Sequence, residues 1–364
     1  MMIHAAVLRD RTGPFGIEEV DLAAPGPGEV LVRVAGAGLC RSDLMPRHVP
    51  IVSGPVVLGH EGAGVVEDVG PGVTRVRPGD HVVLSYDSCG WCARCLGGEP
   101  SYCGQFFPRN LSGRRVDGST SVTDAGGEPV AARWFGQSSF ATHCIAAERG
   151  LVPVDASLPL ETLAPLGCGI QTGAGTALLA LRAGAGSTLA VFGTGAVGLA
   201  AVMAAAAAGA REIVAVDTHP KRRELALELG ATHALDGADP ETAARIAALT
   251  GGGADAALDT TSVPEVVLAA VTSLRPRGTC ALVGSGAADV VLPPRALLGG
   301  QTLRYVMEGD AVPQQFIPVL IALWQNGRFP FDRLVRTYPL SGINDAERDF
   351  GNGDVVKPVL VPAA

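Results

Sequence analysis

The segment between residues 188 and 217 restricts the fold more than any other part of the sequence. An apolar run, Thr188–Phe192, is typical of a strand and leads through Gly193-Thr194-Gly195-Ala196-Val197-Gly198 into an alanine-rich stretch typical of a helix. A second apolar run, Glu212–Val216, ends at the acidic Asp217. A GxGxxG match alone is a weak signal in a chain with 48 glycines, but this strand, helix and acid are the context of a dinucleotide site. The pattern predicts a dinucleotide-binding unit, with a ligand-free turn as the alternative.

Each position of the glycine motif has a physical role at such a site. Gly193 permits a tight turn, Gly195 lets the backbone approach a pyrophosphate, and Gly198 lets the helix pack closely on the strand. The helix begins at Ala196 and Val197, where free N–H groups and partial positive charge favour phosphate. We therefore expect all five residues to bind the cofactor.

The acid and the cations beyond the motif bear on which cofactor is bound. Asp217 can accept hydrogen bonds from both ribose hydroxyls and would repel a 2′-phosphate, which favours NAD over NADP. Arg222 lies between Lys221 and Arg223, and such cations can accommodate that phosphate, so NADP is the less favoured alternative. Val283, at the end of a predicted strand, is also expected to contact the cofactor.

A change in composition and in the order of predicted strands and helices along the chain predicts two domains. Strands and helices alternate through residues 169–305, which indicates an α/β fold with a doubly wound, Rossmann-type parallel sheet. The first 150 residues are rich in Gly, Pro and Val, with short β-type runs at 30–34, 64–69 and 81–84. We expect a mainly β domain formed by residues 1–168 together with 306–364, because the terminal β segment at 355–361 returns to it.

Four cysteines lie within fifteen residues, at positions 89, 92, 95 and 103. Thiolates suit Zn²⁺ or iron–sulfur clusters, and a closed set of four cysteines is typical of structural zinc. In the bacterial ferredoxin run the fourth cysteine follows after three residues and precedes proline, whereas Cys103 follows Cys95 after seven and precedes Gly104. Structural zinc held by Cys89, Cys92, Cys95 and Cys103 is therefore preferred over a [4Fe–4S] cluster.

Cys40, His60 and Cys168 are scattered along the chain, and spacing alone leaves open whether they are ligands or ordinary buried residues. His60 lies in Gly59-His60-Glu61 at the start of a strand, and Cys168 lies between two glycines just before the α/β region. Two thiolates and one imidazole would leave a zinc ion the open position that catalysis requires.

Together these motifs, with Gly64 and Gly70 following Gly59-His60-Glu61, resemble a zinc-dependent medium-chain alcohol dehydrogenase over nearly the whole chain. Residues 135–141, 165–172 and 308–313 resemble the bacterial aryl (benzyl) alcohol dehydrogenase branch in particular. The resemblance implies a GroES-like β domain carrying both zinc sites. It also implies oxidation of a primary, aryl or allylic alcohol to its aldehyde, with hydride transfer to NAD.

The resemblance also implies roles for individual residues. Cys40, His60 and Cys168 would hold a catalytic zinc, and Glu61 would approach the metal during ligand exchange. Further positions follow from the same correspondence: Asp43 would fix the tautomer of His60, Ser42 would take the substrate proton, Arg41 would pair with the pyrophosphate and Thr172 would lie against the nicotinamide.

Two expectations concern proton release and the substrate. Many family members continue the proton relay with a histidine where this chain has Met45, and His48 is the substitute that we consider. Trp134, Ser85 and Tyr86 fall at or beside pocket-wall positions, where a small serine would widen the slot for an aromatic ring. Trp134 as ordinary core is the alternative.

The net charge and the cysteine content limit the classes of partner and the compartments that are expected for this protein. A net charge of −8 argues against a nucleic-acid binder. Residues 183–210 carry no charge and are long enough to cross a bilayer, but glycines break them into a strand, a turn and a helix, so we expect a buried βα unit and no membrane span. We expect a cytoplasmic protein, in which cysteines are thiols or metal ligands, and two zinc ions per chain. By analogy with the family we expect a homodimer or homotetramer that acts on a small molecule, with subunits paired through the strand near 277–283 and the edge following it. A glutathione-dependent formaldehyde dehydrogenase and a catalytically silent binding protein on this fold are the alternatives.

Overall fold

The computed structural model describes residues 1–286 and 288–363, which form two compact units. The first unit contains residues 1–168, 312–318 and 332–364, and the second contains 169–311 and 319–331. Residues 306–311 and 319–331 thus group with the second unit, whereas the sequence analysis places them in the first domain. The reason is packing: η8 (Glu308–Asp310) lies on α5 (Gly169–Gly175), and Arg328 donates a hydrogen bond to the Ala207 carbonyl.

The first unit is built from two sheets whose pairing is antiparallel except between β17 and β18. One sheet has the order β4-β1-β2-β7-β8, with β1 Met2–Leu8, β2 Gly16–Leu22, β4 Val56–Val57, β7 Val122–Thr123 and β8 Pro129–Val130. The other has the order β10-β6-β5-β3-β18-β17, with β9 also paired to β3. Its strands are β3 Glu29–Gly38, β5 Glu61–Val69, β6 His81–Leu84, β9 His143–Ala147, β10 Leu151–Val154, β17 Val335–Pro339 and β18 Lys357–Val361.

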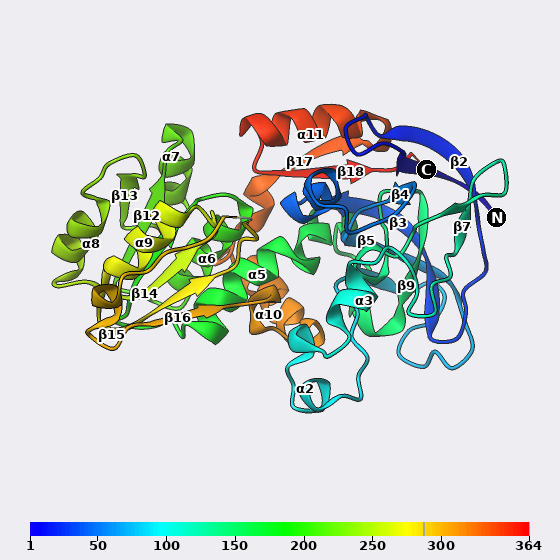
Figure 1. Cartoon of the computed structure of the whole chain (residues 1–364). Coiled ribbons are helices and arrows are strands. Elements are labelled where there is room, and N and C mark those ends of the chain that lie inside the picture. Colours follow the sequence, from blue (N-terminus) through cyan, green and yellow to red (C-terminus); the bar gives the residue numbers. More distant parts are fainter. Residues whose placement is uncertain (287, 364) are drawn as a thin grey trace. The chain divides into compact units, whose positions relative to one another are not determined.

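Short helices connect these strands, and they carry many of the residues singled out in the sequence; α2, α3 and α11 are labelled in Figure 1. They are η1 Arg41–Leu44, α1 Met45–His48, α2 Ala93–Leu96, α3 Phe106–Asn110, η3 Trp134–Gly136, α4 Leu160–Leu163, η5 Ala164–Gly167 and α11 Ile343–Asn352.

The second unit contains an all-parallel sheet of order β13-β12-β11-β14-β15-β16. Its strands are β11 Thr188–Phe192, β12 Glu212–Asp217, β13 His233–Asp236, β14 Ala254–Asp259, β15 Leu274–Leu282 and β16 Thr302–Tyr305. Its helices are α5, α6 Ala196–Ala207, α7 Pro220–Glu228, α8 Thr242–Thr250, α9 Pro264–Thr272 and much of α10 Pro313–Gln325.

Helices cover both faces of this sheet, and the side chains of β11 are therefore buried on both faces. Phe192 packs in one cluster with Ile246 of α8 and Val271 of α9. Val191, whose side chain points to the opposite face, approaches Gly198 at the start of α6. The predicted Rossmann-type unit with a covered parallel sheet is confirmed.

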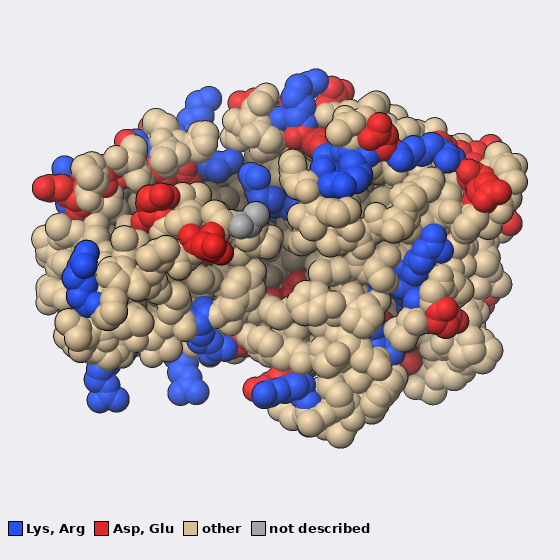
Figure 2. All heavy atoms as spheres, viewed as in Figure 1, with Lys and Arg blue, Asp and Glu red and all other residues tan. Residues whose placement is uncertain are grey.

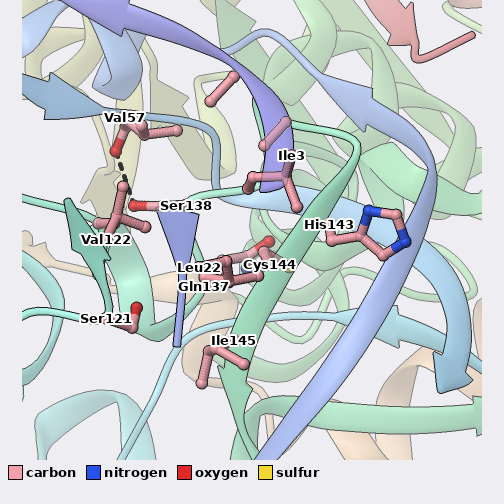
Figure 3. Close-up of a pocket in the computed structure, with 13 residues that line it drawn as sticks. Ile3, Leu22, Val57, Ser121, Val122, Gln137, Ser138, His143, Cys144 and Ile145 are labelled. Atoms are coloured by element: carbon pink, nitrogen blue, oxygen red, sulfur yellow. Dashed lines mark hydrogen bonds between the residues drawn. The ribbon is translucent and has the colours of Figure 1, made fainter. Parts of the chain in front are cut away.

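A small internal cavity in the first unit is no substrate pocket. Its volume is about 10 Å³, and Figure 3 shows its lining side chains, with Ser138 donating a hydrogen bond of 2.7 Å to the Val57 carbonyl. A space of that size holds at most one water molecule.

The surface charge and the length of the helices bear on whether the protein binds a polyanion or crosses a membrane. On the face shown in Figure 2, basic and acidic side chains are interspersed. Among the residues that the structure describes, none of the helices is both long and apolar enough to cross a bilayer.

Candidate zinc and cofactor sites

Three distant parts of the chain bring Cys40, His60, Glu61 and Cys168 together in the first unit. Cys40 lies just after β3, His60 directly precedes β5, Glu61 is the first residue of β5, and Cys168 follows η5. One ligand atom from each residue lies within 4.8 Å of the others, and His60 and Glu61 are fully buried. The packing of η5 against β5 explains how Cys168 reaches residues more than a hundred positions earlier.

Asp43 contacts two parts of this cluster, the Cys40 segment and the segment of Gly59 and His60. Its Oδ1 lies 2.6 Å from Nδ1 of His60 and accepts a hydrogen bond from the Gly59 N–H, while Oδ2 accepts one from the Cys40 N–H. A carboxylate at Nδ1 leaves Nε2 as the metal-binding nitrogen. Asp43 therefore occupies the position that the resemblance implies, and it also fixes the backbone on both sides of the cluster.

The donor set fits a zinc ion. Nε2 of His60 is buried with no hydrogen-bond partner, although buried polar atoms are normally satisfied. Burial opposes a positive charge on His60, yet Asp43 and Cys40 overcome it and raise the pKa of His60 well above its ordinary value. A hydrogen bond with Cys168 and the nearby Lys357 hold the pKa of Cys40 well below its ordinary value, despite burial. Two cysteine sulfurs and a buried imidazole nitrogen without a hydrogen-bond partner, all within 4.8 Å of one another, are a donor set suited to Zn²⁺.

Lys357 is a component of this site that the sequence analysis missed. Its Nζ lies 2.9 and 2.8 Å from the two carboxylate oxygens of Glu61 and 3.3 Å from the Leu39 carbonyl. Burial raises the pKa of Glu61 to about 7, although Lys357 acts to lower it. The only available signal was a charged residue within a strand that is otherwise apolar.

The other residues predicted around the zinc lie on η1 and α1. Ser42 is partly exposed two residues after Cys40, and Arg41 is exposed, with its guanidinium carbon 6.0 Å from the ring centroid of Phe350. His48 is exposed at the last position of α1, and Met45 is half-buried at the first. The structure thus places His48 at the surface, with an α1 turn between it and Ser42.

An aromatic cluster lies against His60. Phe135 stacks on its imidazole with ring centroids 4.4 Å apart, and Trp134 and Phe106 pack on Phe135. Tyr86 extends the cluster through Phe106. Phe135 adopts a left-handed φ of 49°, a strained conformation that often marks functional sites. Trp134 and Tyr86 are among the residues predicted from the sequence, whereas no sequence pattern indicates Phe135 or Phe106.

The expected wall residues are all buried, but they differ in how their polar atoms are used. The Ser85 hydroxyl donates a hydrogen bond of 2.6 Å to the Gly167 carbonyl, next to Cys168. The indole nitrogen of Trp134 is buried without a partner. Ser85 therefore also has a structural function, since it ties β6 to the segment that presents Cys168.

The four cysteines of the lobe also converge. Sγ of Cys95 lies 3.6 Å from Sγ of Cys92 and 3.9 Å from that of Cys89, and a ligand atom of Cys103 lies within 4.8 Å of all three. Sulfurs about 2.3 Å from a tetrahedral zinc are separated by roughly 3.8 Å, so the spacing fits zinc. Backbone N–H groups point at Cys89 and Cys103, as thiolates require, and all eight cysteines of the chain are free of disulfides.

The glycine loop of the second unit has the geometry expected at a phosphate site. Gly193 has a φ of 85°, and a Cβ on Gly198 would lie 1.9 Å from the Gly193 carbonyl oxygen. A Cβ on Gly195, in contrast, would meet no atom within 4 Å. Gly195 is therefore not needed for packing, and the space beside it, at the N-terminus of α6, suits a pyrophosphate.

Asp217 also closes this loop. Its Oδ2 accepts hydrogen bonds from the Thr194 N–H at 2.7 Å and the Thr194 hydroxyl at 2.9 Å, and its Oδ1 accepts one from the His219 N–H. Two carboxylate oxygens offer about four acceptor positions, so capacity remains for a ribose hydroxyl. The sequence predicts only the contact with the ribose, not the hydrogen bonds of Asp217 within the loop.

The remaining predicted cofactor residues lie apart from one another in the second unit. Arg222, on α7, has a buried Nε without a hydrogen-bond partner, and Val283 directly follows β15 at the sheet edge where β11 leads to Gly193. Thr172, on α5, has its hydroxyl 3.4 Å from the carboxylate of Glu308, a residue with a left-handed φ of 51°.

Comparison with known proteins identifies a matching family model in each of the two parts of the chain. Residues 26–156 match the alcohol dehydrogenase GroES-like domain, and residues 196–325 match the zinc-binding dehydrogenase family. Geraniol dehydrogenase of Castellaniella defragrans is 49% identical over 98% of this chain and 97% of its own length. The NDMA-dependent alcohol dehydrogenase of Amycolatopsis methanolica is 40% identical over the full length of both.

Solved structures give the same result. An alcohol dehydrogenase zinc-binding domain protein from Burkholderia ambifaria matches with a TM-score of 0.98 at 49% identity, covering all of both chains. Benzyl alcohol dehydrogenase of Acinetobacter calcoaceticus matches with a TM-score of 0.95 at 41% identity, also over all of both chains. With its cysteine and histidine cluster, four-cysteine lobe and glycine loop, this chain belongs to the zinc-binding alcohol dehydrogenase family.

Proposed function

We propose that this chain interconverts a primary allylic or benzylic alcohol and its aldehyde, with NAD as the hydride carrier. The observation that carries the proposal is the cluster of Cys40, His60 and Cys168, with Phe135 stacked directly on the imidazole. An aromatic side chain beside the reacting centre favours a flat, unsaturated substrate. The names of the geraniol and benzyl alcohol dehydrogenases, which are 49% and 41% identical, support the same substrate class.

We infer two zinc ions per chain, one held by Cys40, His60 and Cys168 and one by the four-cysteine lobe. When bound, zinc at the first site supplies a Lewis acid for the substrate oxygen, and the nicotinamide supplies the hydride acceptor. Asp43 holds His60 in the tautomer that binds metal, and Ser42 accepts the hydroxyl proton. His48, although exposed, is the proposed outlet of that proton to solvent.

The second unit holds the cofactor in this proposal. Arg41 and the N–H groups at Gly195, Ala196 and Val197 hold the pyrophosphate, and Thr172 and Val283 contact the nicotinamide. Asp217 disfavours a 2′-phosphate because it is itself a buried anion, and Arg222 is the residue that would argue for NADP.

A homodimer or homotetramer is proposed from the edge of the parallel sheet. Of the predicted 277–283 strand and the edge that follows it, the first lies inside the sheet as β15, and the second is β16, one of the two edge strands. Leu298 and Val291, close to β16 in sequence, are 82% and 79% exposed. Unpaired edges and exposed apolar side chains are suited to subunit contacts. Eight free cysteines, six of them in the two candidate metal clusters, support a cytoplasmic location.

A substrate panel tests the proposed function. With NAD, the kcat/KM for benzyl, cinnamyl and terpenoid alcohols should exceed that for ethanol by well over tenfold, because each buried apolar group adds about 1–3 kcal/mol of discrimination. Each substrate is assayed with NAD and with NADP by nicotinamide absorbance, with and without added glutathione. Equal kcat/KM values for ethanol and benzyl alcohol, or a requirement for glutathione, would contradict the proposal.

A further inference from the structure

Lys357 is one of only two lysines in the chain, and it is the one that is buried. It opens β18, which lies between β3 and β17, and so brings the last strand of the fold to the metal cluster. Its side chain is 2% exposed and that of Glu61 is not exposed at all. The two carboxylate oxygens, 2.9 and 2.8 Å away, are its acceptors together with the Leu39 carbonyl at 3.3 Å.

A buried ion pair of this kind often adds no net stability to a fold, so its presence needs another explanation. Removing two charges from water costs several kcal/mol for each ion, and apolar replacements are often neutral or stabilising. The pair borders Cys40 and His60, since Leu39 directly precedes Cys40 and Glu61 directly follows His60. Its location therefore points to the metal site.

Glu61 is a competing ligand at that site. A carboxylate oxygen of Glu61 belongs to the group of atoms within 4.8 Å of one another, along with the two sulfurs and the imidazole nitrogen. Zinc with three protein ligands keeps an open position, whereas zinc with four is closed. The same four residues can thus form an open or a closed site, depending on where the Glu61 carboxylate is held.

We propose that Lys357 is a positioning residue that holds Glu61 away from the metal and so keeps the fourth coordination position available to the substrate oxygen. The inference rests on the proposed function, in which Cys40, His60 and Cys168 hold zinc. Two thiolates balance the charge of Zn²⁺, and Lys357 balances Glu61. Without Lys357, the buried carboxylate has the zinc as its nearest remaining cation, and its coordination closes the site.

Binding of 1,10-phenanthroline to the zinc-loaded protein, followed by ultraviolet difference titration without cofactor, reports the open position directly. We expect K357M to bind this probe 10–100-fold more weakly than the wild type, the usual effect of losing a residue that positions a metal ligand. K357R keeps the positive charge and should bind within a few-fold of the wild type. Zinc per chain is measured in each sample, so that loss of metal is distinguished from closure.

The double variant K357M/E61Q separates positioning from general damage. Glutamine is a poor zinc ligand, so the double variant should bind the probe as tightly as E61Q alone. R348M, which removes a cation from an exposed ion pair with Asp345, is the matched control. If K357M yields too little protein, the comparison of E61Q with K357M/E61Q carries the test.

Two results would overturn the inference: K357M that binds the probe as the wild type does, or K357M/E61Q that binds it more weakly than E61Q. In both cases the wild type still binds zinc and probe at this site, so the proposed function stands. A wild type that holds no zinc at Cys40, His60 and Cys168 would instead refute the proposed function.

Discussion

Asp43 shows how much of the candidate site depends on one buried side chain. It contacts the Cys40 backbone, the Gly59 backbone and the His60 ring, and it is not exposed to solvent. The sequence supports its role only through the family resemblance, because an acid three residues after a cysteine is otherwise an ordinary turn residue. Lys357 was missed for a related reason: its partner lies 296 positions away, and no local pattern records that contact.

Replacing Asp43 with Asn should lower zinc affinity at the Cys40 site, or activity, by 10–100-fold, because the amide no longer fixes the imidazole by charge. The measurement is zinc retained per chain during titration with a chelator, together with kcat and KM. Asp345→Asn removes an exposed carboxylate and is the control. Unchanged metal retention in D43N would show that Asp43 serves the turn alone.

At the scale of elements, long periodic segments were predicted well and short edge strands were not. The strand Thr188–Phe192 agrees with β11 residue for residue, and the alanine-rich stretch predicted as a helix after the glycine motif forms α6. The predictions omitted β13 (His233–Asp236) and β16 (Thr302–Tyr305), each of four residues at one edge of the sheet. Such strands bury only part of their side chains, so their sequences carry little hydrophobic alternation.

Two substitutions in the glycine loop, Gly195→Ala and Gly198→Ala, distinguish a glycine needed for cofactor binding from one needed for packing. Gly195→Ala should fold with an unchanged melting temperature and bind NADH at least tenfold more weakly, because its Cβ enters space left for phosphate. Gly198→Ala should destabilise the protein, because its Cβ meets the Gly193 carbonyl. Melting curves and NADH fluorescence titrations separate the two effects, and equal stability losses in both variants would contradict this assignment.

Glu29, at the start of β3, makes the stability of the first unit sensitive to acid. Burial alone would raise its pKa, but Arg115 and Arg133 outweigh this and hold the pKa below its ordinary value of 4.5. The stabilisation from a lowered pKa is complete above 4.5 and is lost as the pH falls through the native pKa. E29Q should lose about 3–5 kcal/mol of unfolding free energy at pH 7, because two arginines lose their carboxylate.

Urea unfolding from pH 7 down to pH 3 provides the measurement. The wild-type free energy of unfolding should approach that of E29Q as the pH falls below 4.5. A difference between them that is constant over the whole range would mean that the ionisation of Glu29 contributes nothing to stability.

For the whole molecule, metal content is the most direct check. The wild type should contain two zinc ions per chain and no iron. Cys40→Ser should contain about one zinc, lose turnover and still bind NADH, because the glycine loop belongs to the other unit. Cys95→Ser should also lose one zinc, but with a lowered melting temperature, since structural zinc contributes directly to folding. Full activity in C40S, or four iron atoms per chain, would contradict the site assignments.

The position of Lys357 on the last strand has a consequence for biosynthesis. Cys168, the last of the three proposed zinc ligands, is translated 189 residues before Lys357, an interval of roughly 10–40 s at 5–20 residues per second. Throughout that interval the nascent chain contains every ligand, but Glu61 lacks the ammonium group that restrains it. If Lys357 has the proposed role, a zinc ion bound during that interval would be within reach of Glu61 as well as of the three proposed ligands, and the coordination position for substrate would become available only when β18 inserts beside β3.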